Sequence, residues 1–106
     1  MTNKNICIIT PLSSKLDRRQ CERLFEAIKE NIGFQIGLNL DNVMDCTIDF
    51  IEMLSCFTNL NLYNINSNIF ALFNVMNVDK SSNLYVSEED FILSKNRLLN
   101  RKFSIV

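Results

Sequence analysis

The side chains able to do chemistry are few, because the chain contains four cysteines but no histidine. Without histidine there is no imidazole to act as an acid, a base or a metal ligand near neutral pH. Only two glycines are present, which excludes the glycine-rich loops that cradle phosphates. No CxxC pair occurs among Cys7, Cys21, Cys46 and Cys56, so neither a zinc site nor a thioredoxin-like pair is expected. These absences favour a protein that is not an enzyme and that uses no metal and no cofactor.

Length and charge narrow the choice of partner. The chain has 106 residues, 47% of them hydrophobic and 22% charged, which predicts one compact domain over residues 1–106. Eleven basic residues against 12 acidic ones give a net charge of -1 with no basic stripe, so we expect no nucleic-acid binding. The apolar run near the N-terminus is shorter than the roughly 20 residues of a membrane span. We therefore expect a cytoplasmic protein without membrane insertion, which free thiols also fit.

Apolar runs alternate with helical patterns along the chain. Strands are predicted at residues 5–12, 34–40, 60–63 and 84–86. A first helix follows Asp17, with one apolar face and Gly33 as its C-terminal cap; that face consists of Cys21, Leu24, Phe25, Ile28 and Ile32. A second helix is predicted at residues 48–58, where Thr47 is the expected N-cap. This alternation predicts an α/β domain whose mostly parallel central sheet has about four strands, with about four helices.

Two further helices complete this pattern. Ser67 is the expected cap of the third helix. Ser87-Glu88-Glu89-Asp90 is a capping box that opens a fourth helix, which we expect to include Leu98 and Leu99. The apolar C-terminal tail is expected to fold back on the domain; its apolar residues are Phe103, Ile105 and Val106.

The order of these segments and their sequence motifs resemble those of the STAS domain, the family of anti-sigma factor antagonists and sulfate transporter tails. Leu16-Asp17 resembles the start of the family's first helix, and residues 36–46 resemble its block "v-v-l-D-L-s-x-v-x-x-i-D-S". Residues 60–66 resemble the strand that runs into the third helix, and residues 72–79 resemble "L-x-x-x-g-l-d". Ser87-Glu88-Glu89 matches the start of the last helix. The resemblance runs nearly end to end and implies a STAS-like domain.

The resemblance also implies a functional position. In antagonists of the family, the block "D-S-S-G-L" places a serine at the start of the second helix, where a partner kinase phosphorylates it. Here that block reads Asp45-Cys46-Thr47-Ile48-Asp49, so Cys46 occupies the phosphoacceptor position and Ile48 replaces the glycine. The usual serine switch is therefore absent, and we expect a GHKL-type serine kinase to leave Cys46 unphosphorylated.

Several interpretations of these residues remain open. Cys46 can be a small packing residue or a redox-sensitive thiol at a helix N-terminus, and the acceptor role can move to Thr47. Asp45 fits a turn carboxylate stabilised by the helix dipole. Asp49 and Glu52 fit a solvated helix face or an acidic edge that contacts a partner. The predicted partner surface consists of Asp45, Cys46, Thr47, Asp49 and Glu52.

Three functions follow from these interpretations. The first is a bacterial, non-enzymatic interaction module of transcription regulation, a monomer or weak homodimer that regulates an anti-sigma factor or serine kinase. The second is the STAS subunit that docks on the ATPase of a phospholipid-transport ABC system. The third is a thiol-based redox sensor centred on Cys46, which the lack of histidine and of a nearby basic residue disfavours.

Overall fold

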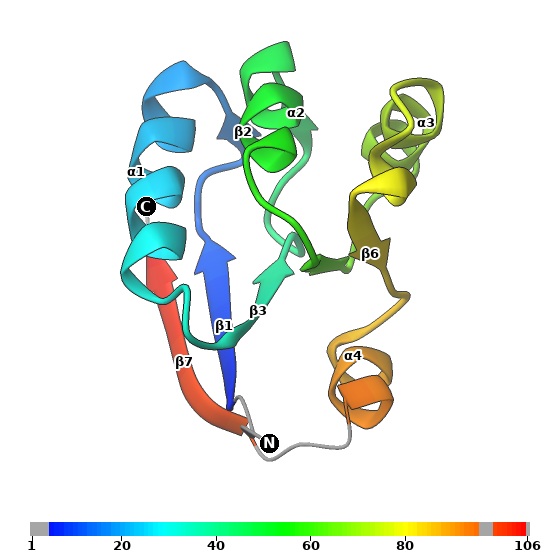
Figure 1. Ribbon diagram of the computed structural model, residues 1–106. Coiled ribbons are helices and arrows are strands. Elements are labelled where there is room, and N and C mark those ends of the chain that lie inside the picture. Colours follow the sequence, from blue (N-terminus) through cyan, green and yellow to red (C-terminus); the bar gives the residue numbers. More distant parts are fainter. Residues whose placement is uncertain (1–4, 96–98, 106) are drawn as a thin grey trace.

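The computed structural model describes the backbone of residues 5–95 and 99–105, and the side chains of residues 5–94. Within these ranges the chain is an α/β structure in which four helices pack around a five-stranded parallel sheet (Figure 1). The expected fold class is confirmed, with one strand more than expected. The strands run in the spatial order β6-β5-β3-β1-β7; they are β1 (Ile6–Pro11), β3 (Gln35–Asn39), β5 (Leu60–Tyr63), β6 (Ser82–Leu84) and β7 (Leu99–Ile105).

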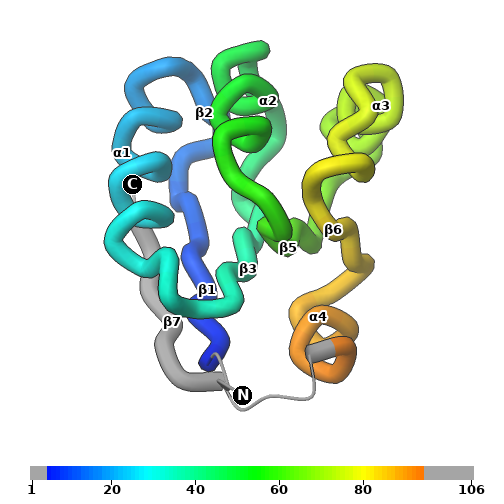
Figure 2. The backbone as a smooth tube through the Cα atoms, viewed as in Figure 1, coloured from blue at the N-terminus to red at the C-terminus, as the bar shows by residue number. Residues whose placement is uncertain are grey.

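The helices are distributed unequally over the two faces of the sheet. Strands β1, β3, β5 and β6 add in chain order, so right-handed crossovers carry their connecting helices to one face. These helices are α1 (Arg18–Glu30), α2 (Ile48–Ser55) and α3 (Ser67–Val75), and a short 3₁₀ turn, η1 (Val78–Lys80), follows α3. Helix α4 (Glu88–Lys95) packs on the opposite face, and the tube in Figure 2 shows it apart from the other three.

The position of β1 in the sheet explains why residues 6–9 are all apolar and do not alternate with polar residues. Cys7 and Ile9 belong to the large core beneath α1, α2 and α3, whereas Ile6 and Ile8 belong to the smaller core that contains Phe91 of α4. All four side chains are fully buried. A parallel strand covered on both faces needs apolar residues at every position, which is the pattern of residues 6–9.

Two helix caps are asparagines instead of the expected residues. Helix α1 ends at Glu30 and is capped by Asn31, whose backbone N–H donates to the Ile28 carbonyl (3.0 Å). Ile32, expected on the buried face, therefore lies beyond the helix and is exposed, and Gly33 does not adopt the positive φ of a helix-ending glycine. Helix α3 is likewise capped by Asn66 rather than Ser67.

The C-terminal segment is a strand where a helix was expected to continue. Leu99, expected in the fourth helix, opens β7, which pairs in parallel with β1. The reason is that β1 would otherwise leave one edge of its hydrogen-bonding groups unpaired. The backbone of Phe103 pairs with that of Ile9, so the expected folding back of the tail is confirmed for residues 99–105. Leu98 and Val106 lie outside the described residues.

Asparagine also makes sharp turns in this glycine-poor chain. Asn59, Asn64 and Asn77 adopt left-handed backbone conformations, with φ of 63°, 57° and 58°. Glycine is the usual residue at such positions, and asparagine is among the few others that tolerate them. Asparagine thus takes the place of glycine at these three turns.

Candidate interaction site at the start of α2

A short second sheet connects the two loops that precede α1 and α2. Its strands, β2 (Lys15–Leu16) and β4 (Asp45–Cys46), run in parallel beyond the carboxyl ends of β1 and β3. The backbone N–H groups of Met44 and Asp45 both donate to the Ser14 carbonyl, at 2.7 Å and 3.1 Å. The carboxyl ends of parallel strands are where α/β folds place their sites. Asp45 and Cys46 are therefore held in this position by backbone pairing.

The carbonyl oxygen of Leu16 joins α1 and α2 at this point. It accepts hydrogen bonds from the backbone N–H of Thr47 (3.1 Å) and from its hydroxyl (3.3 Å). The Cys21 thiol, in the first turn of α1, points to the same oxygen at 3.8 Å. One acceptor thus fixes the first residues of both helices relative to each other.

Thr47 lies at the N-cap position of α2, as expected, but its hydroxyl does not bond to the helix backbone. The side chain makes no capping bond to the helix. Its single hydroxyl proton is instead shared between the Leu16 carbonyl and the Asp49 carboxylate, whose oxygen lies 3.1 Å away. Thr47 therefore connects the loop before α1, through Leu16, to Asp49 of the predicted partner surface.

Cys46 is a buried thiol in this structure. Its side chain is 8% exposed, and burial raises its pKa from 9.0 to about 11, with the neighbouring Asp45 carboxylate adding to the effect. Burial also raises the pKa of Cys21 to about 12, with further contributions from Asp49, Cys46 and Asp17. Both thiols are protonated at neutral pH, and a protonated thiol is a poor nucleophile. This environment favours the packing role of Cys46 over the redox-sensitive one.

The predicted surface residues divide into two groups. Asp45 is exposed on the small sheet, and Cys46 lies beneath it. Half-buried Asp49 and exposed Glu52 lie farther along α2, on the side that faces α1. Thr47 connects the two groups: it follows Cys46 in the chain, and its hydroxyl donates to the Asp49 carboxylate.

Three exposed apolar residues at this end of the molecule were not among the predicted site residues. Leu12, Met44 and Ile48 are 48%, 63% and 50% exposed. They come from the same loops and helix start that β2 and β4 hold together, and we call them, with Asp45 and Thr47, the α2 platform. The periodicity of α2 could have indicated that Ile48 is exposed, because it lies nearly opposite the centre of the buried side, which consists of Phe50, Ile51, Met53 and Leu54.

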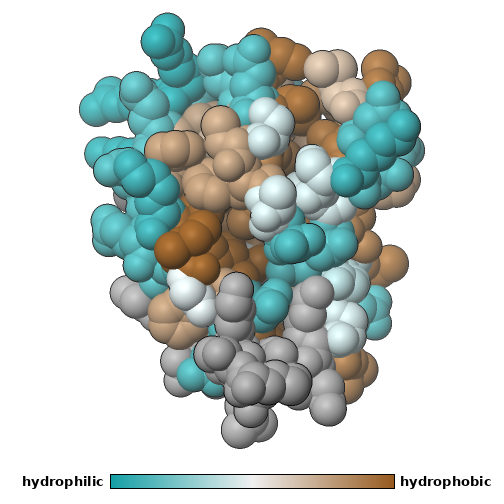
Figure 3. All heavy atoms as spheres, viewed as in Figure 1, coloured by the Kyte–Doolittle hydropathy of each residue, from teal (hydrophilic) through white to brown (hydrophobic). Residues whose placement is uncertain are grey.

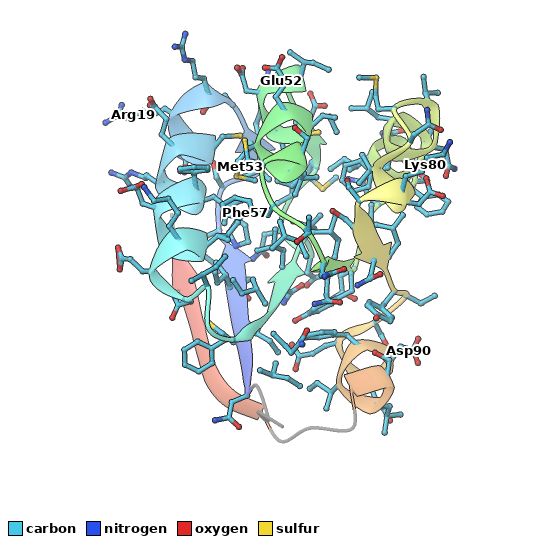
Figure 4. All side chains as sticks on the ribbon, in the orientation of Figure 1. Arg19, Glu52, Met53, Phe57, Lys80 and Asp90 are labelled. Atoms are coloured by element: carbon cyan, nitrogen blue, oxygen red, sulfur yellow. The ribbon has the colours of Figure 1, made fainter. Side chains whose placement is uncertain are left out.

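A groove of about 510 Å³ runs beside the platform, between α1 and α2. Figure 3 shows apolar side chains gathered on this face, with hydrophilic ones over α1 at its border. In Figure 4, Met53 and Phe57 extend from the α2 segment into the space between the helices, whereas Arg19 points from α1 away from it. The groove is lined by Arg18, Cys21, Glu22, Phe25, Glu26, Asp49, Glu52, Met53 and Cys56.

Neither protein-family models nor curated protein sequences give a match to this chain. Among the side chains of residues 5–94, no group of three or more histidine, cysteine, aspartate or glutamate residues could hold a metal ion. Within the described part of the chain, no helix combines the length and the apolar character needed to cross a membrane.

Proposed function

We propose that this chain is a STAS-like, non-enzymatic protein-interaction module of the bacterial cytoplasm, which regulates an anti-sigma factor or serine kinase through the α2 platform. The observation that carries the proposal is the construction of this platform. Backbone pairing between β2 and β4 holds the loops of the platform together, and these loops and the start of α2 carry exposed Leu12, Met44, Asp45 and Ile48. Apolar residues that remain exposed on a rigid surface are typical of sites that bind another protein.

The state of Cys46 and Thr47 supports a module without a serine switch. Cys46 lacks a hydroxyl to phosphorylate and is buried beneath the platform. Thr47 has a hydroxyl, but its proton is already engaged with the Leu16 carbonyl and the Asp49 carboxylate. The raised pKa of Cys46 also argues against the redox-sensor alternative.

Capture of partners with the purified, tagged chain tests the proposal. The bait is compared with a Met44→Glu/Ile48→Glu double variant, and the captured proteins are quantified by mass spectrometry. The matched control is Val75→Glu/Val86→Glu, which places the same charges at two exposed apolar positions around α3. We expect an anti-sigma factor or kinase to be captured by the native and control chains and lost with the platform variant.

Other outcomes of the capture would decide against parts of the proposal. A partner retained equally by all three baits would show that the α2 platform is not the binding surface. Capture of a transporter ATPase would assign the chain to a phospholipid-transport ABC system. A second step mixes the captured kinase, ATP and the chain and measures intact mass, where no added phosphate is expected. One phosphate located on Thr47 would contradict a module without a switch.

A further inference from the structure

The groove between α1 and α2 has an apolar floor that the core leaves accessible. Half-buried Phe25 lines the groove, and its ring centroid lies 5.2 Å from that of Phe57 and 5.2 Å from Lys29 Nζ. Met53 and Cys21 form deeper parts of the floor, and Cys56 is exposed at one end. An apolar strip between two parallel ridges of side chains is the shape into which a third helix packs.

Acidic side chains border the floor on both helices. Glu22 and Glu26 project from α1, and Asp49 and Glu52 project from α2. Arg18 is the basic residue of the lining, and Lys29 pairs with Glu26 at 3.3 Å, so the border keeps a negative balance.

From this geometry we infer that the groove binds an amphipathic helix of a partner protein, with apolar residues flanked by lysine or arginine. This inference rests on the proposed function, because it names the kind of segment that an interaction partner contributes. Both walls use residues at helical spacing, from Arg18 to Glu26 on α1 and from Asp49 on α2 to Cys56 at its C-cap. At 1.5 Å per residue these walls are about 10 to 12 Å long, which fits about two turns of a bound helix.

Charge complementarity selects this occupant over a second copy of the chain. A second copy docked symmetrically would bring the same acidic border against itself, and like charges placed together oppose association. A basic helix instead places its ammonium or guanidinium groups against Glu22, Asp49 and Glu52 while its apolar residues cover Phe25 and Met53. The interaction should therefore weaken as salt screens the border.

The first test uses a fluorescein-labelled synthetic peptide of about 18 residues, five helical turns. Its leucines are spaced i, i+3, i+4 and i+7 and flanked by lysines, and binding to the full chain is followed by fluorescence anisotropy. We expect binding at micromolar concentration that weakens at least about tenfold when salt rises from about 0.05 to 0.5 M. A peptide with glutamates in place of the lysines should not bind. Equal binding of the two peptides would overturn the inference.

Charge reversal then locates the peptide. Glu22→Lys/Glu52→Lys should weaken binding of the lysine peptide by about tenfold or more, because two attractions become repulsions. The matched control, Glu89→Lys/Asp90→Lys, makes the same change in net charge on α4 and should bind as the native chain does. The reversed chain should also prefer the glutamate peptide, and this exchange of preference excludes simple misfolding. Unchanged affinity in the reversed chain would refute the groove as the site.

Cys56 provides a second, local measurement. It is the exposed cysteine of the groove, whereas Cys21 is buried in its floor. Bound peptide should slow alkylation of Cys56 by iodoacetamide in proportion to occupancy, as followed by peptide mass spectrometry. Alkylation at the free rate under saturating peptide would refute the inference. Protection that increases with chain concentration alone would identify a second copy as the occupant instead.

The outcomes for the groove and for the proposed function can be separated. Met44 and Ile48 are absent from the lining of the groove, and Glu22 is absent from the α2 platform. If native partners require the platform but the basic peptide does not bind, the proposed function stands and the groove inference fails. If the peptide binds in the groove but the platform variant captures partners as well as the native chain does, the groove inference stands and the proposed function fails.

Discussion

Replacing Gly37 by alanine should destabilise the fold, because Phe91 of α4 occupies the space that a side chain would need. A Cβ atom at Gly37 would lie 2.4 Å from Phe91 Cε2 and 3.0 Å from Cδ2. The ring has little freedom to retreat, since its centroid lies 5.7 Å from the rings of both Tyr63 and Tyr85. The contact is therefore between β3 and a side chain already enclosed by two others.

The expected magnitude combines two opposing effects. Inserting a methyl group into a packed core costs about 1–3 kcal/mol. Gly37 has no positive φ, so alanine can adopt its backbone conformation, and a less flexible unfolded chain returns about 0.4–1 kcal/mol. We expect a net loss of about 1–2 kcal/mol in the free energy of unfolding, which corresponds to a melting temperature lower by roughly 5–10 °C.

Urea denaturation followed by circular dichroism measures this loss, and Gly33 supplies the matched control. No atom lies within 4 Å of a Cβ built at Gly33, and its φ is also compatible with alanine. Gly33→Ala should therefore leave stability unchanged or raise it by up to about 1 kcal/mol. Combining Gly37→Ala with Phe91→Leu should cost less than the sum of the two single changes. Equal stability of the two alanine variants would refute the steric argument.

Two further predictions concern the start of α2. Thr47→Val should lower the free energy of unfolding by about 1 kcal/mol in urea denaturation, because the hydroxyl proton has two acceptors there, and Thr47→Ser should restore most of the loss. The pKa values of Cys46 and Cys21 are about 11 and 12 in the folded chain, above the usual 9.0. Because folding favours their protonated forms, the contribution of the two thiols to stability should be constant below about pH 9 and be lost as pH rises from there toward 12. Urea titrations across this range should show the fall, and Cys21→Ala/Cys46→Ala should reduce it. The remainder comes from Tyr63, since burial raises the pKa of its hydroxyl as well. An unchanged slope in the cysteine variant would exclude the thiols as a cause.

The strands and helices of the core could be predicted because burial leaves a periodic pattern in the sequence. Residues 60–63 are a strand as expected, and Ile51, Leu54 and Phe57 are buried as expected around α2. The ends of elements were less predictable, because capping depends on single hydrogen bonds. Asn31 ends α1 by bonding the Ala27 carbonyl through its side chain (2.7 Å), a role that sequence patterns assign to glycine.

The candidate site was predictable only in part for a related reason. The motif that places Cys46 and Thr47 at the start of a helix is local, and α2 begins at Ile48 as expected. The two-residue strands β2 and β4 are too short to show any periodicity. The groove is lined by residues of both α1 and α2. The periodicity of each helix shows which side is buried, but it does not show how the two helices lie against each other.

Strand β7 has a consequence for how the chain folds during synthesis. Strands β3, β5 and β6 each join a neighbour that is already made, whereas the second edge of β1 must wait for residues 99–105, which are translated after the other described elements. Until then, one edge of β1 presents free N–H and carbonyl groups on a segment rich in isoleucine. Such edges readily pair with strands of other chains. The nascent protein should therefore be most prone to aggregation just before β7 emerges from the ribosome.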